Sequence, residues 1–364
     1  MEDKKTSFDS FNTFVFTGRI LTNKVSVEKK KTAKSEMIKM KLSLKSGYNI
    51  HNLEKVFFKP LDESRDVFYF VDKEKEARKI AFSKRKEIEV DKLSHLHCKL
   101  STRENEQRYV SEYDFMIDLY KAIQDGIITN NDIVKINGSI DYNNYVKDGI
   151  KKTYANYNFK KIEVLPMNED GTPPRESSFA SIKMYTEKDS FFKLDNVGIL
   201  SGKALTKKRE KDPNGQDLYE ASDVSVEIEL GDNPDRVFEI LKDKYTPKTN
   251  NLGLVGLNVE VINGSPEVEF TEDMLSKQDR ELIDIGFTTF DALKKEKGIG
   301  KGEFVKKYKF VSNIRGYSEG AKEMVFTLED ITGAKEVTLE EIKSDSSNLT
   351  ELDDRDIFGE DTPF

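Results

Sequence analysis

Alternating apolar and polar residues predict several half-buried strands in the first 165 residues. Positions 38, 40, 42 and 44 are apolar and the residues between them are polar, the pattern of a strand with one face in a core. Residues 12–21 are rich in β-branched and aromatic side chains and predict an earlier strand, and residues 56–60 predict a third that ends at a proline. Two further strands are expected over 133–140 and 151–165, around a turn at 147–149.

A change of period predicts a helix between the third and fourth of these strands. Phe115, Leu119 and Ile123 recur at helical spacing, Ser111 supplies an N-cap and Gly126 a stop. The order of three strands, a helix and two strands is that of the OB-fold, a five-stranded Greek-key barrel that commonly holds oligonucleotides.

The same pattern restarts in the second half of the chain. Residues 195–205 parallel residues 12–21, and residues 308–314 resemble residues 158–164. Between them the sequence predicts a strand that alternates over 224–230, a helix over 234–245 and a strand over 252–262. An internal duplication of the OB unit is the simplest account. The second copy shows no third strand, and residues 271–298, with two short helical patterns, form an insertion before its last strand.

We therefore predict a mainly β protein of tandem five-stranded OB-fold barrels with helical and strand insertions. The expected units are an N-terminal OB-fold over 1–166 with an insertion of short strands at about 61–110, a Pro- and Ser-containing linker over 167–190, a second OB-like domain over 191–334 and a disordered acidic tail over 335–364.

Charge divides the chain into parts of opposite sign. The net charge of the 364 residues is −8, but residues 1–165 hold 32 Lys and Arg against 25 Asp and Glu. Residues 166–339 hold 25 against 33, and the last 25 residues hold 2 against 9. This asymmetry indicates a basic binding module, a second acidic module and an acidic interaction tail.

Several classes of protein lack support in the sequence. The longest uncharged stretch, residues 249–259, is far shorter than the ~20 residues of a membrane helix, and no apolar segment follows the N-terminus. We therefore expect neither a membrane span nor a secretory signal, and the single Cys98 agrees with a reducing cytoplasm. The common catalytic and phosphate-binding motifs are missing, so we expect no enzyme and no cofactor. His95, His97 and Cys98 offer three zinc ligands, but without a second ligand cluster a metal site is disfavoured.

Tyrosines and lysines interleave in the predicted closing hairpin. Residues 142–157 contain four tyrosines and three lysines. Single-stranded nucleic acid needs both types, because cations track its phosphates while flat rings stack on its bases for ~1–3 kcal/mol each. For Tyr142 and Tyr157, cross-strand or core packing is an equal alternative, whereas binding is favoured for Tyr145 and Tyr154 near the tip. The candidate single-strand-binding residues from this pattern are Tyr142, Tyr145, Lys151, Lys152, Tyr154 and Tyr157, to which Lys29, Lys31 and Lys34 add either phosphate contacts or a merely solvated loop between the first two strands.

The end of the chain combines acidic residues with a terminal phenylalanine. An aromatic anchor suits an apolar pocket, while the α-carboxylate and acidic side chains suit a surrounding positive patch. The sequence therefore predicts a docking segment for partner proteins. Its candidate residues are Asp353, Asp354, Asp356, Glu360, Asp361, Pro363 and Phe364.

Three passages together resemble the bacterial-type single-stranded DNA-binding proteins (SSBs), in a bacteriophage version with two OB-folds. Residues 12–21, with Gly18-Arg19, are similar to the opening strand of that family, and residues 134–140 with Tyr145, the Asp-Gly turn and Tyr154 are similar to its closing hairpin. Residues 360–364 resemble its acidic C-terminal tip, which is the most specific of the three.

The resemblance implies a protein that coats single-stranded DNA without catalysis in replication, recombination and repair. It also implies a tip that recruits replication and recombination proteins, and a place in the cytoplasm of a bacterial host. It adds Arg19 to the DNA contacts and, because the chain has no tryptophan, assigns base stacking to Phe57, Phe58 or tyrosines. Self-association remains open.

Two alternatives remain beside this interpretation. The first is an adaptor or inhibitor of host replication proteins, built from two small barrels, that does not bind DNA. The second, a nuclease with carboxylate ligands at scattered positions, has no positive support. The acidic second domain departs from the family pattern, so weak DNA binding there would rest on Lys203, Lys207, Lys208 and Arg209.

Overall fold

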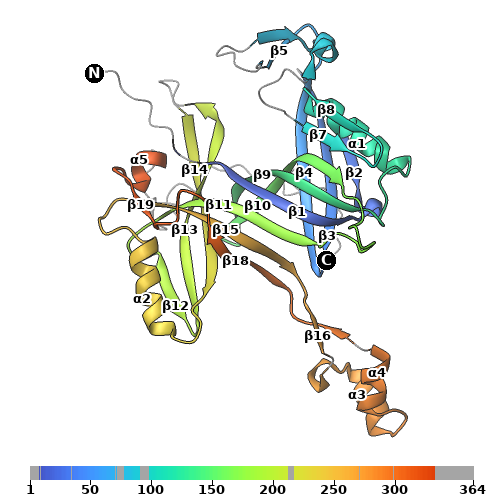
Figure 1. The fold of residues 1–364 in the computed structure, drawn as a ribbon, viewed down its shortest axis with the longest axis vertical. Coiled ribbons are helices and arrows are strands. Elements are labelled where there is room, and N and C mark those ends of the chain that lie inside the picture. The colour runs from blue at the N-terminus through green and yellow to red at the C-terminus, as the bar shows by residue number, and fades with distance from the viewer. Residues whose placement is uncertain are drawn as a thin grey trace.

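Strands dominate the computed structural model of the chain (Figure 1). It describes residue 8 and residues 10–33, 35–69, 71, 78–90, 98–211, 217–269, 271–297 and 299–332. The predicted tail over 335–364, and with it every candidate partner-binding residue, lies outside these ranges. In the described part of the chain, no helix combines the length and the apolar character that crossing a membrane would require.

The first barrel closes in the order that defines an OB-fold. β1 pairs with β3, β3 with β4, β4 in parallel with β10, β10 with β9, and β9 returns to β1. Helix α1 lies between the third and fourth strands of this circuit, as predicted, and the Ser111 side chain caps it by accepting from the Tyr113 backbone N–H at 3.2 Å. The elements are β1 (Asn12–Ile20), β3 (Ser35–Ser46), β4 (Asn49–Pro60), α1 (Glu112–Gln124), β9 (Ile133–Lys147) and β10 (Ile150–Val164).

The second barrel repeats the same circuit. β11 pairs with β13, β13 with β14, β14 in parallel with β18, β18 with β15, and β15 returns to β11. Helix α2 has the predicted bounds and occupies the place of α1. The elements are β11 (Ser177–Thr186), β13 (Val197–Lys211), β14 (Asp217–Glu229), α2 (Pro234–Tyr245), β15 (Gly253–Gly264) and β18 (Val305–Asn313). The tandem OB architecture is thus confirmed.

The predicted linker over 167–190 is wrong. It contains β11, which is the first strand of the second barrel, so the segment 195–205 corresponds to the second strand and not to the first. The strand that seemed to be missing from the second copy is therefore β11. The prediction took β13, the second strand of the second barrel, as its first strand.

β1 and β11 join the two barrels into one continuous sheet. The two strands pair antiparallel, from Thr13 opposite Ser181 to Thr17 opposite Ser177. A second contact pairs Asn49 at the start of β4 with Gly264 at the end of β15. One hydrophobic cluster runs through both barrels, so they form a single packed body (Figure 1).

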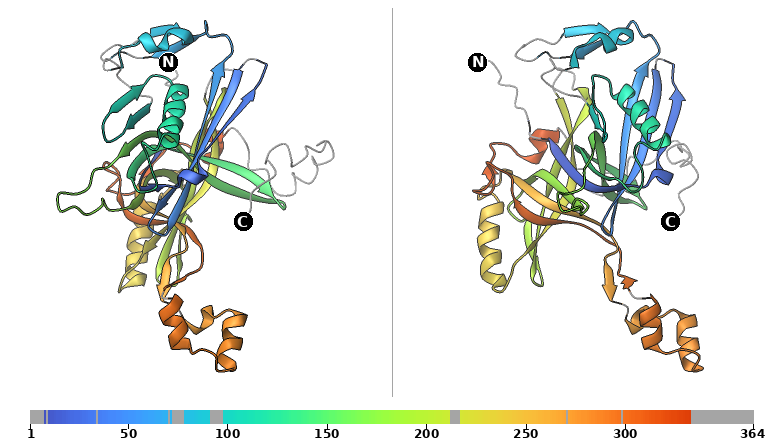
Figure 2. Two further views of the ribbon diagram at one scale, coloured as in Figure 1. Left: turned by 90° about the vertical axis from the view of Figure 1, so that its right-hand side faces the viewer. Right: turned by 45° about the vertical axis from the view of Figure 1, so that its right-hand side comes forward.

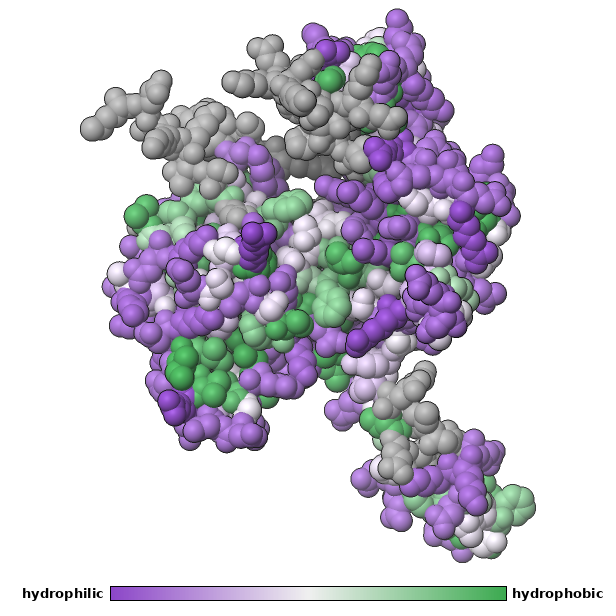
Figure 3. All heavy atoms as spheres, in the orientation of Figure 1, coloured by the Kyte–Doolittle hydropathy of each residue, from purple (hydrophilic) through white to green (hydrophobic). Residues whose placement is uncertain are grey.

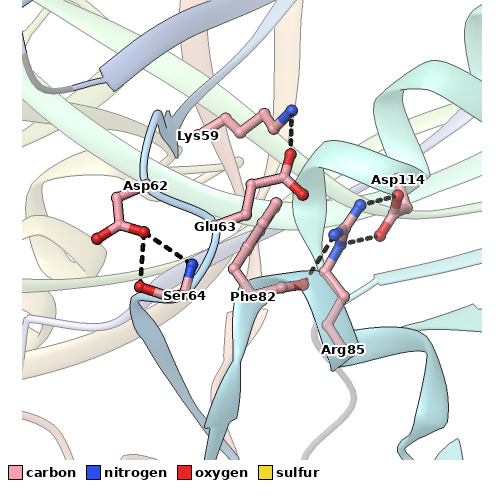
Figure 4. Close-up of polar contacts among 7 residues, drawn as sticks. All are labelled: Lys59, Asp62, Glu63, Ser64, Phe82, Arg85 and Asp114. Atoms are coloured by element: carbon pink, nitrogen blue, oxygen red, sulfur yellow. Dashed lines mark hydrogen bonds and ion pairs between the residues drawn. The ribbon is translucent and has the colours of Figure 1, made fainter.

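The predicted insertion after the third strand consists of short strands and a 3₁₀ helix; β7, β8 and η2 contact α1, whereas β5 and β6 pair with each other. Arg85 joins the 3₁₀ helix to α1. Its guanidinium donates two hydrogen bonds to Asp114 at 2.6 and 2.8 Å and a third to the Phe82 carbonyl at 2.8 Å (Figure 4). Lys59 at the end of β4 pairs with Glu63 at 2.7 Å. The elements are β5 (Asp66–Tyr69), β6 (Arg78–Ala81), η2 (Phe82–Glu87), β7 (Cys98–Ser101) and β8 (Glu106–Tyr109).

The predicted insertion before the last strand is an appendage that stands clear of the barrels (Figure 2). It connects β15 to β18 and holds two helices on a two-stranded stem. Its elements are β16 (Glu267–Glu269), η4 (Glu272–Met274), α3 (Lys277–Asp284), α4 (Phe290–Lys297) and β17 (Ile299–Lys301). The remaining short elements of the chain are η1 (Thr22–Lys24), β2 (Ser26–Lys31), β12 (Phe191–Leu194), β19 (Lys322–Glu323) and α5 (Leu328–Thr332).

Candidate nucleic-acid interface

The β9–β10 hairpin extends beyond the body of the barrels (Figure 2). Its strands stay paired up to Lys147 opposite Ile150, and the turn uses left-handed backbone at Asp148 (φ 55°) and Gly149 (φ 73°). Asp-Gly suits such a two-residue turn because both residues tolerate positive φ. The sequence therefore forms a regular two-stranded arm at the predicted place.

Two tyrosines meet on the outward face of this arm. The rings of Tyr145 and Tyr154 pack edge to face, with centroids 5.8 Å apart and planes at 62°. Tyr145 is 38% exposed and Tyr154 46% exposed, so each ring retains free surface. Tyr145 lies directly opposite Lys152, and residues 152 and 154 share a face because side chains alternate along a strand. Two aromatic rings and one cation thus form a single exposed patch.

Lys151 points the other way. It lies opposite Val146 and shares the second face of the arm with Asn144. That face rests on the second barrel, where the Asn144 side chain donates to Glu220 Oε1 at 2.8 Å and to the Ala221 carbonyl at 3.0 Å. Thr206 also exchanges hydrogen bonds of 3.0 and 2.9 Å with the Tyr142 backbone. The second barrel therefore contacts the face of the arm opposite the two tyrosines.

Tyr142 and Tyr157 belong to the core, which corrects the expectation that they stack on bases and favours the packing alternative. Both side chains are buried, and both hydroxyls lie 3.4 Å from the Tyr308 hydroxyl of β18. Burial raises the pKa of both phenols above the ordinary value. Neither ring offers a face to a base, so packing was the correct alternative for this pair.

Phe57 and Phe58 point to opposite sides of β4. Phe57 is partly buried within 6.5 Å of the Phe82 and Tyr113 rings, whereas Phe58 is exposed. Phe58 lies opposite Met37, on the outward face of the β2–β3–β4 sheet. Of the two phenylalanines, only Phe58 is therefore placed to stack on a base.

The basic segment after β1 is a strand rather than the predicted loop. β2 pairs with β3, and alternation puts Lys30 on the outward face opposite Met37, while Lys29 and Lys31 face the other way. Lys34 lies outside the described residues. The outward face also carries Lys39 and Lys41, each ion-paired within the sheet, which the alternation of residues 37–45 would have identified as outward-facing.

Arg19 is already engaged within the protein. Its guanidinium lies 3.3 Å from Glu176 and donates to the Asn131 carbonyl at 2.9 Å. A phosphate at this position would compete with a carboxylate, so Arg19 contributes less free positive charge than its sequence motif implies.

Four lysines of the second barrel are paired with carboxylates of β14. Lys203 contacts Asp223 at 2.8 Å and Lys207 contacts Asp217 at 2.5 Å. From β18, Lys307 and Lys309 reach Glu227 and Glu229, each at 2.6 Å. In the arm, by contrast, Lys147, Lys151 and Lys152 form no ion pair within the part of the chain that the structure describes. The positive charge of these three lysines is therefore not offset by a carboxylate within the described residues.

The outer face of β13–β14 is also covered by the chain itself. Leu205 and Tyr219 belong to a second hydrophobic cluster that includes Ile331 of α5 and packs against Phe326. Phe8 packs edge to face on Tyr219 and on Phe326, with centroids 5.3 and 4.9 Å apart. This cover, together with the ion pairs, occupies part of the outer face of β13–β14.

The cysteine considered as a metal ligand is buried in β7. Burial raises the pKa of the Cys98 thiol to about 12, so the thiol is neutral at ordinary pH. His95 and His97 lie outside the described residues, and within the described ranges no cluster of three His, Cys, Asp or Glu side chains could hold a metal.

Comparison with known proteins adds a distant likeness of fold. No protein-family model matches the chain, and no curated protein matches it. A deletion mutant of the single-stranded DNA binding protein from Thermus aquaticus is 10% identical, over 70% of this chain and 86% of that chain, with a TM-score of 0.29. The wild-type protein is 8% identical, over 70% and 85% of the two chains, with a TM-score of 0.31. Likenesses at this level concern the fold alone.

Proposed function

We propose that the chain binds single-stranded nucleic acid without catalysis, mainly on the first barrel. The observation that carries the proposal is the patch of Tyr145, Tyr154 and Lys152 on the outward face of the arm. Exposed rings stack on bases whatever their sequence, and an unpaired ammonium attracts phosphate. The patch has both groups on one two-stranded element.

The outward face of β2–β3–β4 extends this surface. Phe58 offers a further ring, exposed Lys30 lies opposite Met37 on the same face, and exposed Lys45 lies at the other end of β3. OB-folds commonly hold oligonucleotides on the face of their second and third strands and on the adjoining loops. We propose a path from this face to the arm.

Within this function, we propose the finer role of an SSB of a bacteriophage. The protein would coat single-stranded DNA during replication, recombination and repair, in the cytoplasm of a bacterial host. The acidic end of the chain, Asp353–Phe364, would recruit replication and recombination proteins. This role rests on the three passages that resemble the SSB family.

A titration of the full chain with a labelled oligo(dT) tests the basic function. Fluorescence anisotropy should show binding that weakens as salt rises and that a duplex competitor of the same length displaces poorly. Equal affinity for duplex and single strand, or an affinity that salt does not change, would refute the proposal.

Deletion of residues 353–364 tests the role of the tail separately. Affinity for oligo(dT) should stay the same or rise, because a competing polyanion is removed, while a host replication protein that binds the full chain should no longer bind. A partner retained by the truncated protein would refute this part alone. If no oligonucleotide binds but partners do, the adaptor interpretation replaces the first one.

A further inference from the structure

The appendage occupies the same loop of the second barrel that the DNA-binding arm occupies in the first. β9 and β10 are joined by the turn at Asp148–Gly149, and the corresponding strands β15 and β18 are joined by residues 265–304. The arm is basic and aromatic, whereas the far end of the appendage is acidic and apolar. Equivalent positions of two OB-folds thus present surfaces of opposite charge.

Two large apolar side chains are almost fully exposed at the far end of the appendage. Ile285 is 75% exposed and Phe287 78% exposed, in the turn between α3 and α4. The turn is held by backbone hydrogen bonds, from Gly286 N to Ile283 O and from Phe287 N to Leu282 O, each 2.9 Å. Gly286 has a φ of 73°, as expected for the residue that ends a helix. The apolar pair is therefore displayed by an ordered turn.

The helices on either side of this turn have an N-terminal cap and a buried apolar residue. Ser276 and Asp279 form a reciprocal capping box at the start of α3, with bonds of 3.0 and 3.1 Å, and Leu293 of α4 is buried. Since the appendage buries Leu293 but leaves Ile285 and Phe287 in water, the exposed pair is not part of its own core. Exposed apolar pairs rimmed by polar residues commonly mark contact sites.

The basic residues of the appendage lie outside its far end. α3 begins with Lys277 and Arg280, and α4 ends with three lysines, so the basic residues lie near the stem. Residues 281–291, at the far end, contain Glu281, Asp284 and Asp291 and no Lys or Arg. Figure 3 shows the appendage as a separate, largely hydrophilic lobe. Every charged residue of this segment is thus a carboxylate.

We propose that this tip, Glu281–Asp291 with Ile285 and Phe287 at its centre, docks a protein partner that presents an apolar pocket bordered by Lys and Arg side chains. Nucleic acid is disfavoured because its phosphates would meet three carboxylates. Apolar anchors inside a charged rim give such contacts both affinity and orientation. This surface shares no residue with the arm or with the acidic end of the sequence.

An amphipathic Leu/Lys peptide, whose apolar stripe is edged with lysines, is the probe for this surface. The full chain, labelled with ¹³C at isoleucine methyl groups, should show a saturable shift of the Ile285 methyl signal that weakens from 50 to 300 mM NaCl. A Leu/Glu peptide of the same pattern should leave this signal in place. Phe287→Ser should weaken the peptide's affinity by ~10-fold or more.

Phe304→Ser is the matched control, since Phe304 is 66% exposed but lies at the base of the appendage, where β18 begins. It should leave the affinity for the Leu/Lys peptide unchanged, and neither variant should alter oligo(dT) binding. An unmoved Ile285 signal, an equal response to the Leu/Glu peptide, or an Ile285 shift caused by oligo(dT) would overturn the proposal. None of these outcomes depends on whether the arm binds DNA.

Discussion

His51 Nε2 lies 2.7 Å from Ser178 Oγ and joins β4 of the first barrel to β11 of the second. The imidazole is fully buried and stacks on Phe16, with ring centroids 4.0 Å apart and planes at 21°. Burial lowers the pKa of His51 from 6.5 to about 4, because the charged ring would lose its hydration. One of the contacts between the barrels therefore contains a neutral histidine.

Stability should fall as the pH drops through the range between these two pKa values. Below pH 6.5 the unfolded chain binds a proton at His51, whereas the folded protein does so only near pH 4, so acid favours unfolding. This group should make the free energy of unfolding about 2 kcal/mol smaller at pH 5 than at pH 7.5. Urea unfolding at both values measures the difference. His51→Gln should reduce the difference by that amount, and an equal pH dependence in both proteins would contradict the assignment.

Tyr145→Ala and Tyr154→Ala should each weaken oligo(dT) binding by ~10-fold, because each removes a ring worth ~1–3 kcal/mol of stacking. The measurement is anisotropy at constant salt. Phe192→Ala is the control, since Phe192 is 49% exposed but lies on β12 of the second barrel. If Phe192→Ala reduced the affinity for oligo(dT) as much as Tyr154→Ala, any exposed aromatic residue would contribute to binding, and the arm would have no special role.

Substitution of Lys151 and of Lys152 should change the salt dependence of oligo(dT) affinity to different extents. Lys152 shares the outward face with the two tyrosines, whereas Lys151 shares the face that rests on the second barrel. Lys152→Ala should therefore lower the slope of log affinity against log salt by about 0.7, the value for one phosphate contact on a single strand. Lys151→Ala should change the slope less. The reverse order would show that the strand runs along the other face.

Gly138→Ala should destabilise the first barrel. An added Cβ would lie 2.1 Å from the Asn158 carbonyl oxygen and 2.7 Å from the Phe14 ring, where β9 and β10 approach closely. We expect a loss of about 2–4 kcal/mol in the free energy of unfolding, measured with urea. Ser139→Ala, on the outward face beside it, should change stability by less than ~0.5 kcal/mol. Similar losses in both variants would argue against this close approach.

The sequence predicted elements wherever apolar residues keep the period of a regular structure. Alternation identified β3, helical spacing identified α1 and α2, and the Asp-Gly turn placed the arm. β11 was missed for a physical reason: its inward positions start with the small Ser178 and Ala180, where the barrels meet, and its large Phe179 points outward. The first half of β4 was missed because buried His51 and Lys55 interrupt its apolar face.

The sequence predicted which residue types form the proposed binding surface, but not which face of the strand each residue lies on. Tyr142 and Tyr145 lie three residues apart on one strand, so alternation sends one into the core and the other to the surface. Which of them is buried depends on the second barrel, whose Tyr308 hydroxyl lies 3.4 Å from that of Tyr142. Such a contact between residues 166 positions apart leaves no trace in local sequence.

Photochemical crosslinking of the full chain to an oligo(dT) that carries 5-iodouracil tests the central claim most directly. Mass spectrometry of the crosslinked peptides should place the adducts on Tyr145 and Tyr154 of the arm, with Phe58 as a further site. The crosslinks should disappear as salt rises, together with binding. Adducts confined to the second barrel, with none on residues 142–157, would contradict the account.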